Sequence, residues 1–216
     1  MKVIQGILLL VAIGITNGAE AKLQCKGPHV NVPKDWITMV PPCIQKMRDQ
    51  VEIELRAAVT YLAMGAHFSR DVVNRPGFAK MFFEHANEER EHAMKVIAYL
   101  LMRGELTSDV AKLIRNPMPL KEHWESGVAA LKDALKLETE VTNRIRSIIM
   151  ECETPQGETF NDYHLVDYLT GDFLEEQYKG QRDLAGKIST LDKMMESHGA
   201  LGEFLFDKKL LKGQPV

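Results

Sequence analysis

Four long stretches of the chain carry apolar residues at the three- and four-residue spacing of an α-helix. The predicted helices span about residues 41–70, 77–103, 121–151 and 160–189. Each measures about 40 Å at 1.5 Å per residue, which is long for a globular protein and typical of a helical bundle. A fifth apolar segment, 201–206, is more hydrophobic than a lone surface helix should be, and we expect other subunits to cover it.

The connections between these stretches predict how the helices are joined. A Pro-Gly turn near 74–77 and a short Pro/Gly loop near 154–157 each make an antiparallel helical hairpin. Residues 104–120 are enough chain to run back along the whole bundle. The sequence therefore predicts an all-α four-helix bundle of two hairpins joined by one long crossover, with a short fifth helix near the C-terminus.

Each apolar stripe contains a polar side chain near its middle that is able to bind a metal ion. These side chains are Glu54, then Glu89 with His92, then Glu138, and finally Gln177. An ionised carboxylate that leaves water costs several kcal/mol, so three of them need a shared positive charge. The stripes offer no Lys or Arg at matching positions, which favours a metal cation as the partner.

The spacing within the stripes supports this interpretation. Glu89 and His92 are three residues apart and therefore share one helix face, and Tyr61 lies two turns beyond Glu54. Glu138 is centred among apolar residues at −7, −3, +3 and +7, namely Leu131, Leu135, Val141 and Ile145. A Glu-x-x-His pair combined with single glutamates from neighbouring helices is how bundles hold two iron or manganese ions.

Each of these residues also has an ordinary interpretation. A single buried glutamate or histidine is commonly a hydrogen-bonded core group, and residues 88–92 taken alone resemble a solvated helix face. The occurrence of such a residue at mid-length on every predicted helix favours the metal site.

The first 21 residues have the pattern of a secretory signal peptide. Lys2 supplies the positive start, residues 7–15 are apolar, and residues 19–21 form a small-x-small cleavage signal. We therefore expect a signal peptide at 1–21 and a mature chain that begins at Lys22.

The mature chain is expected to consist of an N-terminal extension at 22–41 and one helical domain at 42–216. The apolar run in the signal peptide is shorter than the ~20 residues that span a bilayer, so no membrane partner is expected. The net charge of −3, with both signs interspersed, gives no reason to expect a nucleic-acid partner.

The three cysteines are interpreted for an oxidising compartment, in which disulfides persist. Cys25 and Cys43 are expected to form structural bridges, and a bond between subunits remains open. An odd number leaves at least one thiol for another chain or unpaired. Cys152, at the end of the third predicted helix, is expected to be a partly buried free thiol.

Several segments resemble the ferritin family, in the order in which ferritins carry them. They fall within about residues 42–209 and comprise Glu54-Leu55-x-Ala57, Tyr61-Leu62-x-Met64, Asn87-Glu88-Glu89-Arg90-Glu91-His92-Ala93, Trp124-Glu125-Ser126-Gly127, Leu137-Glu138, Glu176-Gln177 and Phe204-Leu205-Phe206-Asp207-Lys208. Ferritins with an oxidase site, the heavy-chain type, carry six site residues, and all six have a match in this chain. The matching residues are Glu54, Tyr61, Glu89, His92, Glu138 and Gln177. With its signal peptide and early cysteines, the chain is similar to the secreted heavy-chain subunits of insect ferritins.

The resemblance implies a ferritin-like bundle that acts as a ferroxidase and oxidises Fe(II) to Fe(III) with dioxygen. It implies that Glu54 and His92 hold one iron, that Glu138 holds the other, and that Glu89 bridges the two.

Two further residues would then act in the outer shell. Gln177 and Tyr61 would orient water, oxygen or ligands around the irons. Gln177 stands where a permanently loaded di-iron enzyme would have a second Glu-x-x-His, so the site has few ligands. That favours iron as a substrate that passes through the site.

The resemblance also implies iron storage as a mineral inside a hollow multi-subunit shell. Glu84, Glu88 and Glu91 match the surface on which the mineral nucleates, although an ordinary acidic helix face remains the alternative. Asp167 matches one acid of the channel through which iron enters, but Thr170 replaces the next expected acid. A light-chain-type partner subunit is expected in such a shell.

Two other function classes remain open. A di-iron oxygenase that retains its metals would need a second histidine on the fourth helix, and none lies near Gln177. A non-catalytic subunit for structure and nucleation would lack Glu54 or His92, and both are present.

Overall fold

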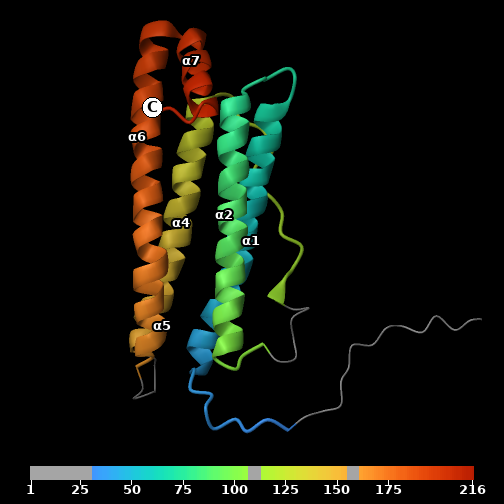
Figure 1. The fold of residues 1–216 in the computed structure, drawn as a ribbon, viewed down its shortest axis with the longest axis vertical. Helices are drawn as coiled ribbons and strands as arrows, with labels where there is room; N and C mark the ends of the chain where they lie inside the picture. Colours follow the sequence, from blue (N-terminus) through green and yellow to red (C-terminus); the bar gives the residue numbers. More distant parts are fainter. Residues whose placement is uncertain (1–30, 107–112, 155–160) are drawn as a thin grey trace, which may run out of the picture. The chain divides into compact units, whose positions relative to one another are not determined.

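The structure is a computed structural model that describes residues 31–106, 113–154 and 161–216. Residues 34–216 form one unit. As labelled in Figure 1, its long helices are α1 (Pro41–Ser69), α2 (Pro76–Met102), α4 (Gly127–Glu153) and α6 (Glu175–His198). No strand occurs in the described part of the chain, so the predicted all-α class is confirmed. None of the helices described is long and apolar enough to cross a membrane.

The connection from α2 to α4 runs back along α1. Arg115 Nε lies 3.7 Å from Glu52 Oε2, and farther along the chain the Leu120 backbone N–H donates a 3.2 Å hydrogen bond to Thr60 Oγ1. The connection thus follows α1 from its middle toward its C-terminal end, and α4 begins at the end of the bundle where α2 also begins (Figure 1). This is the predicted long crossover between two antiparallel hairpins.

The third predicted helix begins later than expected, at Gly127 instead of Lys121. Ser126 has an extended backbone, with φ −156° and ψ 165°, and its side chain accepts a hydrogen bond from the Ala129 backbone N–H. This N-cap starts the helix, so Trp124 lies outside it although its ring is buried. Apolar spacing placed Trp124 in the helix because a buried loop residue and a buried helix residue look alike in sequence.

The fourth predicted helix changes geometry along its length. Helix α5 (Tyr163–Tyr168) leads into a π-helical stretch, η1 (Leu169–Leu174), which continues into α6. Its buried side chains follow in steps of four, at Leu165, Leu169, Phe173 and Gln177. Four residues of an α-helix turn about 40° more than a full circle, so such a row would drift off the core face. The wider π-helical turns keep the row aligned and bring Gln177 toward the core.

Helix α7 (Ala200–Leu211) packs at one end of the bundle and caps two other helices. The buried Asp207 accepts a 2.7 Å hydrogen bond from the Gly77 backbone N–H at the start of α2. Glu203 accepts a 2.8 Å bond from the Gly127 backbone N–H at the start of α4. A carboxylate therefore lies at the start of each of these two helices. It accepts a hydrogen bond from an N–H group that has no partner within the helix, and its negative charge interacts favourably with the helix dipole. Exposed apolar side chains remain on α7, namely Leu201, Phe204, Leu205 and Leu211.

The expectation for Cys152 is wrong. It is not a free thiol but forms a disulfide with Cys43, and both residues are fully buried. The two Cα atoms lie 5.5 Å apart, because antiparallel packing brings the start of α1 to the end of α4. The residues are 109 positions apart, so their pairing appears only once the helices are packed. Cys25 lies outside the described residues, and its expected bridge stays a prediction.

Removal of this disulfide should destabilise the folded chain. In the chain-entropy model a bond that closes a loop of this size is worth about 4–5 kcal/mol. We expect Cys43→Ala/Cys152→Ala to unfold several degrees below the parent in a thermal scan. We also expect a peptide map of the non-reduced parent to contain the Cys43–Cys152 crosslink.

The matched control is Cys25→Ala, which leaves the Cys43–Cys152 pair in place and should retain the crosslinked peptide. An unfolding midpoint in the double variant equal to that of the parent, or a map without the crosslink, would contradict the assignment.

Candidate metal centre

Three metal-binding side chains from two neighbouring helices converge inside the bundle. Glu54 lies on α1, and Glu89 and His92 lie on α2. One ligand atom from each can be chosen so that all three lie within 4.8 Å of one another. His92 Nδ1 is 3.5 Å from Glu89 Oε1, a separation that suits two ligands of one ion at about 2.1 Å each. The structure thus brings together three of the residues predicted from sequence.

These three side chains are almost closed to solvent: Glu54 is 0%, Glu89 2% and His92 4% exposed. Their atoms Glu54 Oε2, Glu89 Oε2 and His92 Nδ1 have no hydrogen-bond partner among the residues that the structure describes. Buried polar atoms without a partner are rare in native proteins and need a physical reason. A cation held between them gives that reason, because it binds the lone pairs that no donor satisfies.

Burial also makes negative charge costly at this centre. It raises the pKa of Glu54 well above its usual value, and the charge of Glu89 raises it further. Burial likewise raises the pKa of Glu89, and the charge of Glu138 adds to the effect. Carboxyl groups that resist ionisation in this way release protons when they bind a metal, since the cation then stabilises their charged form.

The second ring nitrogen of His92 faces a carboxylate. His92 Nε2 lies 3.2 Å from Glu176 Oε2, and the same oxygen lies 3.6 Å from Lys95 Nζ. A carboxylate at Nε2 favours the tautomer that carries its proton there, which leaves the Nδ1 lone pair free for a metal. The predicted site did not include Glu176, because neighbouring residues of an α-helix point about 100° apart and Gln177 was assigned to the core face.

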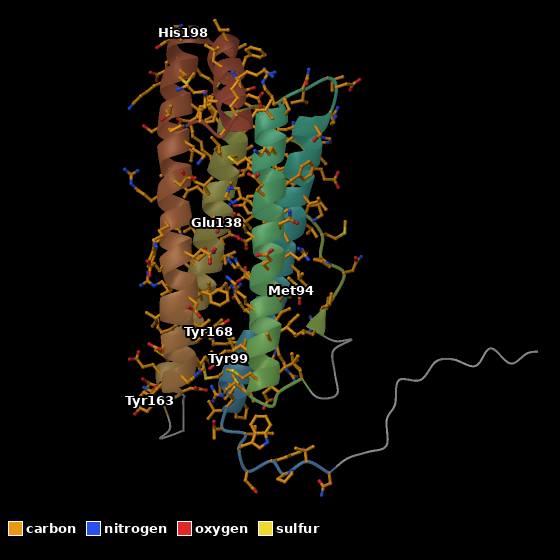
Figure 2. All side chains as sticks on the ribbon, viewed as in Figure 1. Met94, Tyr99, Glu138, Tyr163, Tyr168 and His198 are labelled. Carbon is orange, nitrogen blue, oxygen red and sulfur yellow. A yellow bond between two sulfur atoms is a disulfide. The ribbon has the colours of Figure 1, made fainter. Side chains whose placement is uncertain are left out.

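Glu138, on α4, is not one of the three residues whose ligand atoms converge, and its carboxylate faces Tyr61. Tyr61 Oη donates a 2.5 Å hydrogen bond to Glu138 Oε1. Burial raises the pKa of Tyr61, and the Glu138 charge raises it further, so the phenol keeps its proton. Figure 2 shows Glu138 at mid-length of the bundle. The pair therefore joins α1 to α4 beside the three-residue cluster.

Two polar side chains, each one helical turn from a predicted metal ligand, form hydrogen bonds to Glu54 and Gln177. Gln50 Nε2 donates a 2.7 Å hydrogen bond to Glu54 Oε1, and Thr142 Oγ1 lies 2.9 Å from Oε1 of the buried Gln177. Sequence reasoning missed both Gln50 and Thr142. Their signal is spacing, since Gln50 is four residues before Glu54 and Thr142 four after Glu138, on the same helix faces.

Comparisons with known proteins decide the family. A family model for a ferritin-like domain matches residues 44–194. The chain belongs to the ferritin family. It is 62% identical over 209 residues to the ferritin heavy chain of Papilio xuthus, covering 97% of both chains, and 63% identical over 206 residues to that of Trichoplusia ni, covering 94% of this chain and 97% of the relative. The crystal structure of Trichoplusia ni secreted ferritin matches with a TM-score of 0.84 and 62% identity, over 89% of this chain and 100% of that one.

The other residues predicted from the ferritin resemblance lie on the surface. Glu84, Glu88 and Glu91 are exposed on α2, and Asp167 and Thr170 are exposed on the fourth helix. These five residues lie outside the buried cluster, at the surface of the single chain.

The raised pKa values give metal-free ferritin a pH-dependent stability. A group that binds its proton more tightly when folded stabilises the fold below its unfolded pKa, which is about 4.3 for glutamate. That contribution is lost as pH rises through the folded pKa. For Glu54 and Glu89 we therefore expect a thermal midpoint that falls between about pH 5 and pH 7.5, and a rise on addition of redox-inert Zn(II) that is larger at the higher pH.

The comparison variant is Glu54→Gln/Glu89→Gln, which keeps the side-chain shapes and removes both titrations. It should show a smaller fall with pH and little response to Zn(II). Parent and variant curves that coincide with and without zinc would refute the assignment of these two carboxyl groups.

Proposed function

We propose that this chain is the ferroxidase subunit of a secreted iron-storage ferritin. It oxidises Fe(II) to Fe(III) with dioxygen and passes the product to a mineral core inside a multi-subunit shell. The observation that carries this proposal is the buried cluster of Glu54, Glu89 and His92, with ligand atoms that no protein donor satisfies.

Two iron ions bind in this arrangement. Glu54 and His92 hold one iron, Glu89 bridges, and Glu138 holds the second iron after its carboxylate turns away from Tyr61. Carboxylate oxygens are hard ligands that favour Fe(III) over Fe(II), so they lower the free-energy cost of electron transfer to oxygen. Tyr61 and Gln177 lie in the outer shell, where they orient the groups that bind iron.

Iron is a substrate of this site and not a resident cofactor. The fourth helix offers the neutral Gln177, whose side-chain oxygen is already engaged by Thr142, where a retained metal would need another anionic or imidazole ligand. The histidine of α6, His198, lies at one end of the bundle, away from Glu138 at mid-length (Figure 2). The ligand set thus favours release of the oxidised ion over a di-iron oxygenase that retains it.

Substitution of a ligand should slow iron oxidation. We expect Glu89→Ala and His92→Ala each to reduce the initial rate of aerobic Fe(II) oxidation by more than about tenfold, since even outer-shell changes at metal sites cost that much. The rate is measured from the absorbance of the ferric product in stopped flow with the assembled protein.

The matched control is Glu140→Ala, an exposed glutamate on the same helix as Glu138, which should oxidise iron at the parental rate. If the Glu89→Ala and His92→Ala proteins oxidise iron as fast as the parent, the ferroxidase assignment is wrong and a purely structural subunit becomes the better description.

Iron reaches and leaves the centre over exposed acids. Asp167 contributes to the path by which iron enters, and Glu84, Glu88 and Glu91 form the surface on which the mineral nucleates. Thr170 removes one acid from the inward path, so a light-chain-type partner supplies the missing negative charge in a mixed shell. The exposed apolar side chains of α7 are covered by neighbouring subunits in that shell.

The chain enters the secretory pathway through the signal peptide at 1–21. Similarity to a secreted ferritin and the buried disulfide, which needs an oxidising compartment, both support this route. Amino-terminal sequencing of material secreted by an expressing cell should begin at Lys22. Secreted protein that still begins at Met1 would refute the cleavage.

A further inference from the structure

A row of aromatic rings leads from the metal centre toward one end of the bundle. The ring of His92 lies 5.6 Å from Phe173, and Phe173 lies 5.5 Å from Tyr168. Tyr168 stacks on Tyr99 at 4.6 Å, and Tyr99 lies 5.6 Å from the ring of His164. All these distances are between ring centroids, so the row is continuous from a metal-binding histidine to a second histidine.

The row connects the buried interior with the protein surface. Tyr99 is 3% exposed, Tyr168 is half-buried, and His164 is exposed. Figure 2 shows Tyr168 and Tyr99 between Glu138 at mid-length and Tyr163 at the end of the bundle. The π-helical stretch contributes Phe173, so the same geometry that brings Gln177 toward the core also places the first ring of the row.

The hydroxyl group of Tyr99 lies within hydrogen-bond distance of two side chains, Arg103 and His164. Arg103 Nη1 lies 2.8 Å from Tyr99 Oη and can only donate, because a guanidinium has no acceptor. His164 Nδ1 lies 2.9 Å from the same oxygen, and it accepts the tyrosine hydrogen in the tautomer that carries the imidazole proton on Nε2. Two hydrogen bonds to Asp162, of 2.8 and 3.0 Å, hold Arg103 in this position.

We propose that Tyr168 and Tyr99 form a one-electron relay that removes oxidising equivalents from the metal centre. The relay rests on the proposed function, which supplies the oxidant as the peroxide made from dioxygen. It acts when peroxide meets a single Fe(II) and the second electron is missing.

The reaction balances with one electron from iron and one from tyrosine. Hydrogen peroxide, Fe(II), the phenol of Tyr99 and one proton give two water molecules, Fe(III) and the phenoxyl radical of Tyr99. The O–O bond breaks, and the two oxygens take up two electrons and two protons. The phenolic proton moves to His164 Nδ1, which returns it to solvent, while the protons used at the centre come from water.

The surroundings of Tyr99 suit this step. Burial raises the pKa of Tyr99 to about 12, so the ring is a neutral phenol and must lose its proton when it is oxidised. Without an acceptor that proton would stay as an unpaired charge in a buried place. Phe173 has no such proton and serves only as the bridge between His92 and Tyr168. The ligands Glu54, Glu89 and His92 are thereby spared from oxidation.

Rapid freezing and electron paramagnetic resonance test the relay. The assembled protein receives Fe(II) below one ion per centre and then hydrogen peroxide, and a tyrosyl radical is expected in the parent. Tyr99→Phe and Tyr168→Phe should each lower the radical yield several-fold, with unchanged initial rates of aerobic Fe(II) oxidation. The matched controls Tyr163→Phe and Tyr178→Phe, at tyrosines 75% and 50% exposed, should keep the parental yield.

A further variant tests the proton step. His164→Ala alters an exposed residue and keeps the rings of Tyr99 and Tyr168, so the yield should fall only because the acceptor is lost. An unchanged yield in this variant would overturn the role of His164 and the relay with it.

The remaining outcomes separate the relay from the proposed function. Normal aerobic iron oxidation without a radical, or a radical that survives in Tyr99→Phe and Tyr168→Phe, overturns the relay and leaves the ferroxidase intact. A radical lost only in Tyr61→Phe places it on the phenol at the centre and also overturns the relay. A parent protein that does not oxidise Fe(II) overturns both.

Discussion

Negative charge buried between helices is the constraint on which the rest of this protein depends. Glu54 and Glu89 are closed to solvent, and burial together with their neighbours' charge raises the pKa of both. Such an arrangement makes the free energy of folding less favourable, and a bound cation offsets that effect. The same feature links the proposed function to stability: the unpaired atoms proposed to bind iron are the atoms that make the metal-free bundle less stable.

The helices that carry these acids are also fixed at their ends. At one end a disulfide joins the start of α1 to the end of α4, and at the other Asp207 and Glu203 cap α2 and α4. The middle of the bundle is then free to hold polar groups, because its alignment does not depend on packing there alone. Side chains one helical turn from the ligands, such as Gln50, complete the orientation.

Residue spacing was sufficient to predict the bundle, the crossover and the acids on its inner faces, because helix periodicity puts Glu89 and His92 on one side without reference to other helices. Features that arise from packing could not be predicted. The partner of Cys152 is 109 residues away. The contact of Glu176 with His92 depends on the wide turns of the fourth helix. Trp124 was assigned to a helix because its burial resembles that of a helix residue.

The neutral side chain of Gln177 on the fourth helix links the release of iron to the need to protect the metal ligands from oxidation. A site that binds iron with few ligands lets Fe(III) leave, but for part of the time it holds only one Fe(II) ion. Peroxide can then react at the site while the second iron ion is missing. A fully liganded centre would avoid that state and would stop being a route for iron. The stacked pair of Tyr99 and Tyr168 lies where an electron donor is needed, beyond Phe173 and away from the carboxylates. The π-helical stretch of the fourth helix positions both Gln177 and Phe173, so the proposed release of iron and the proposed electron relay depend on the same helix geometry.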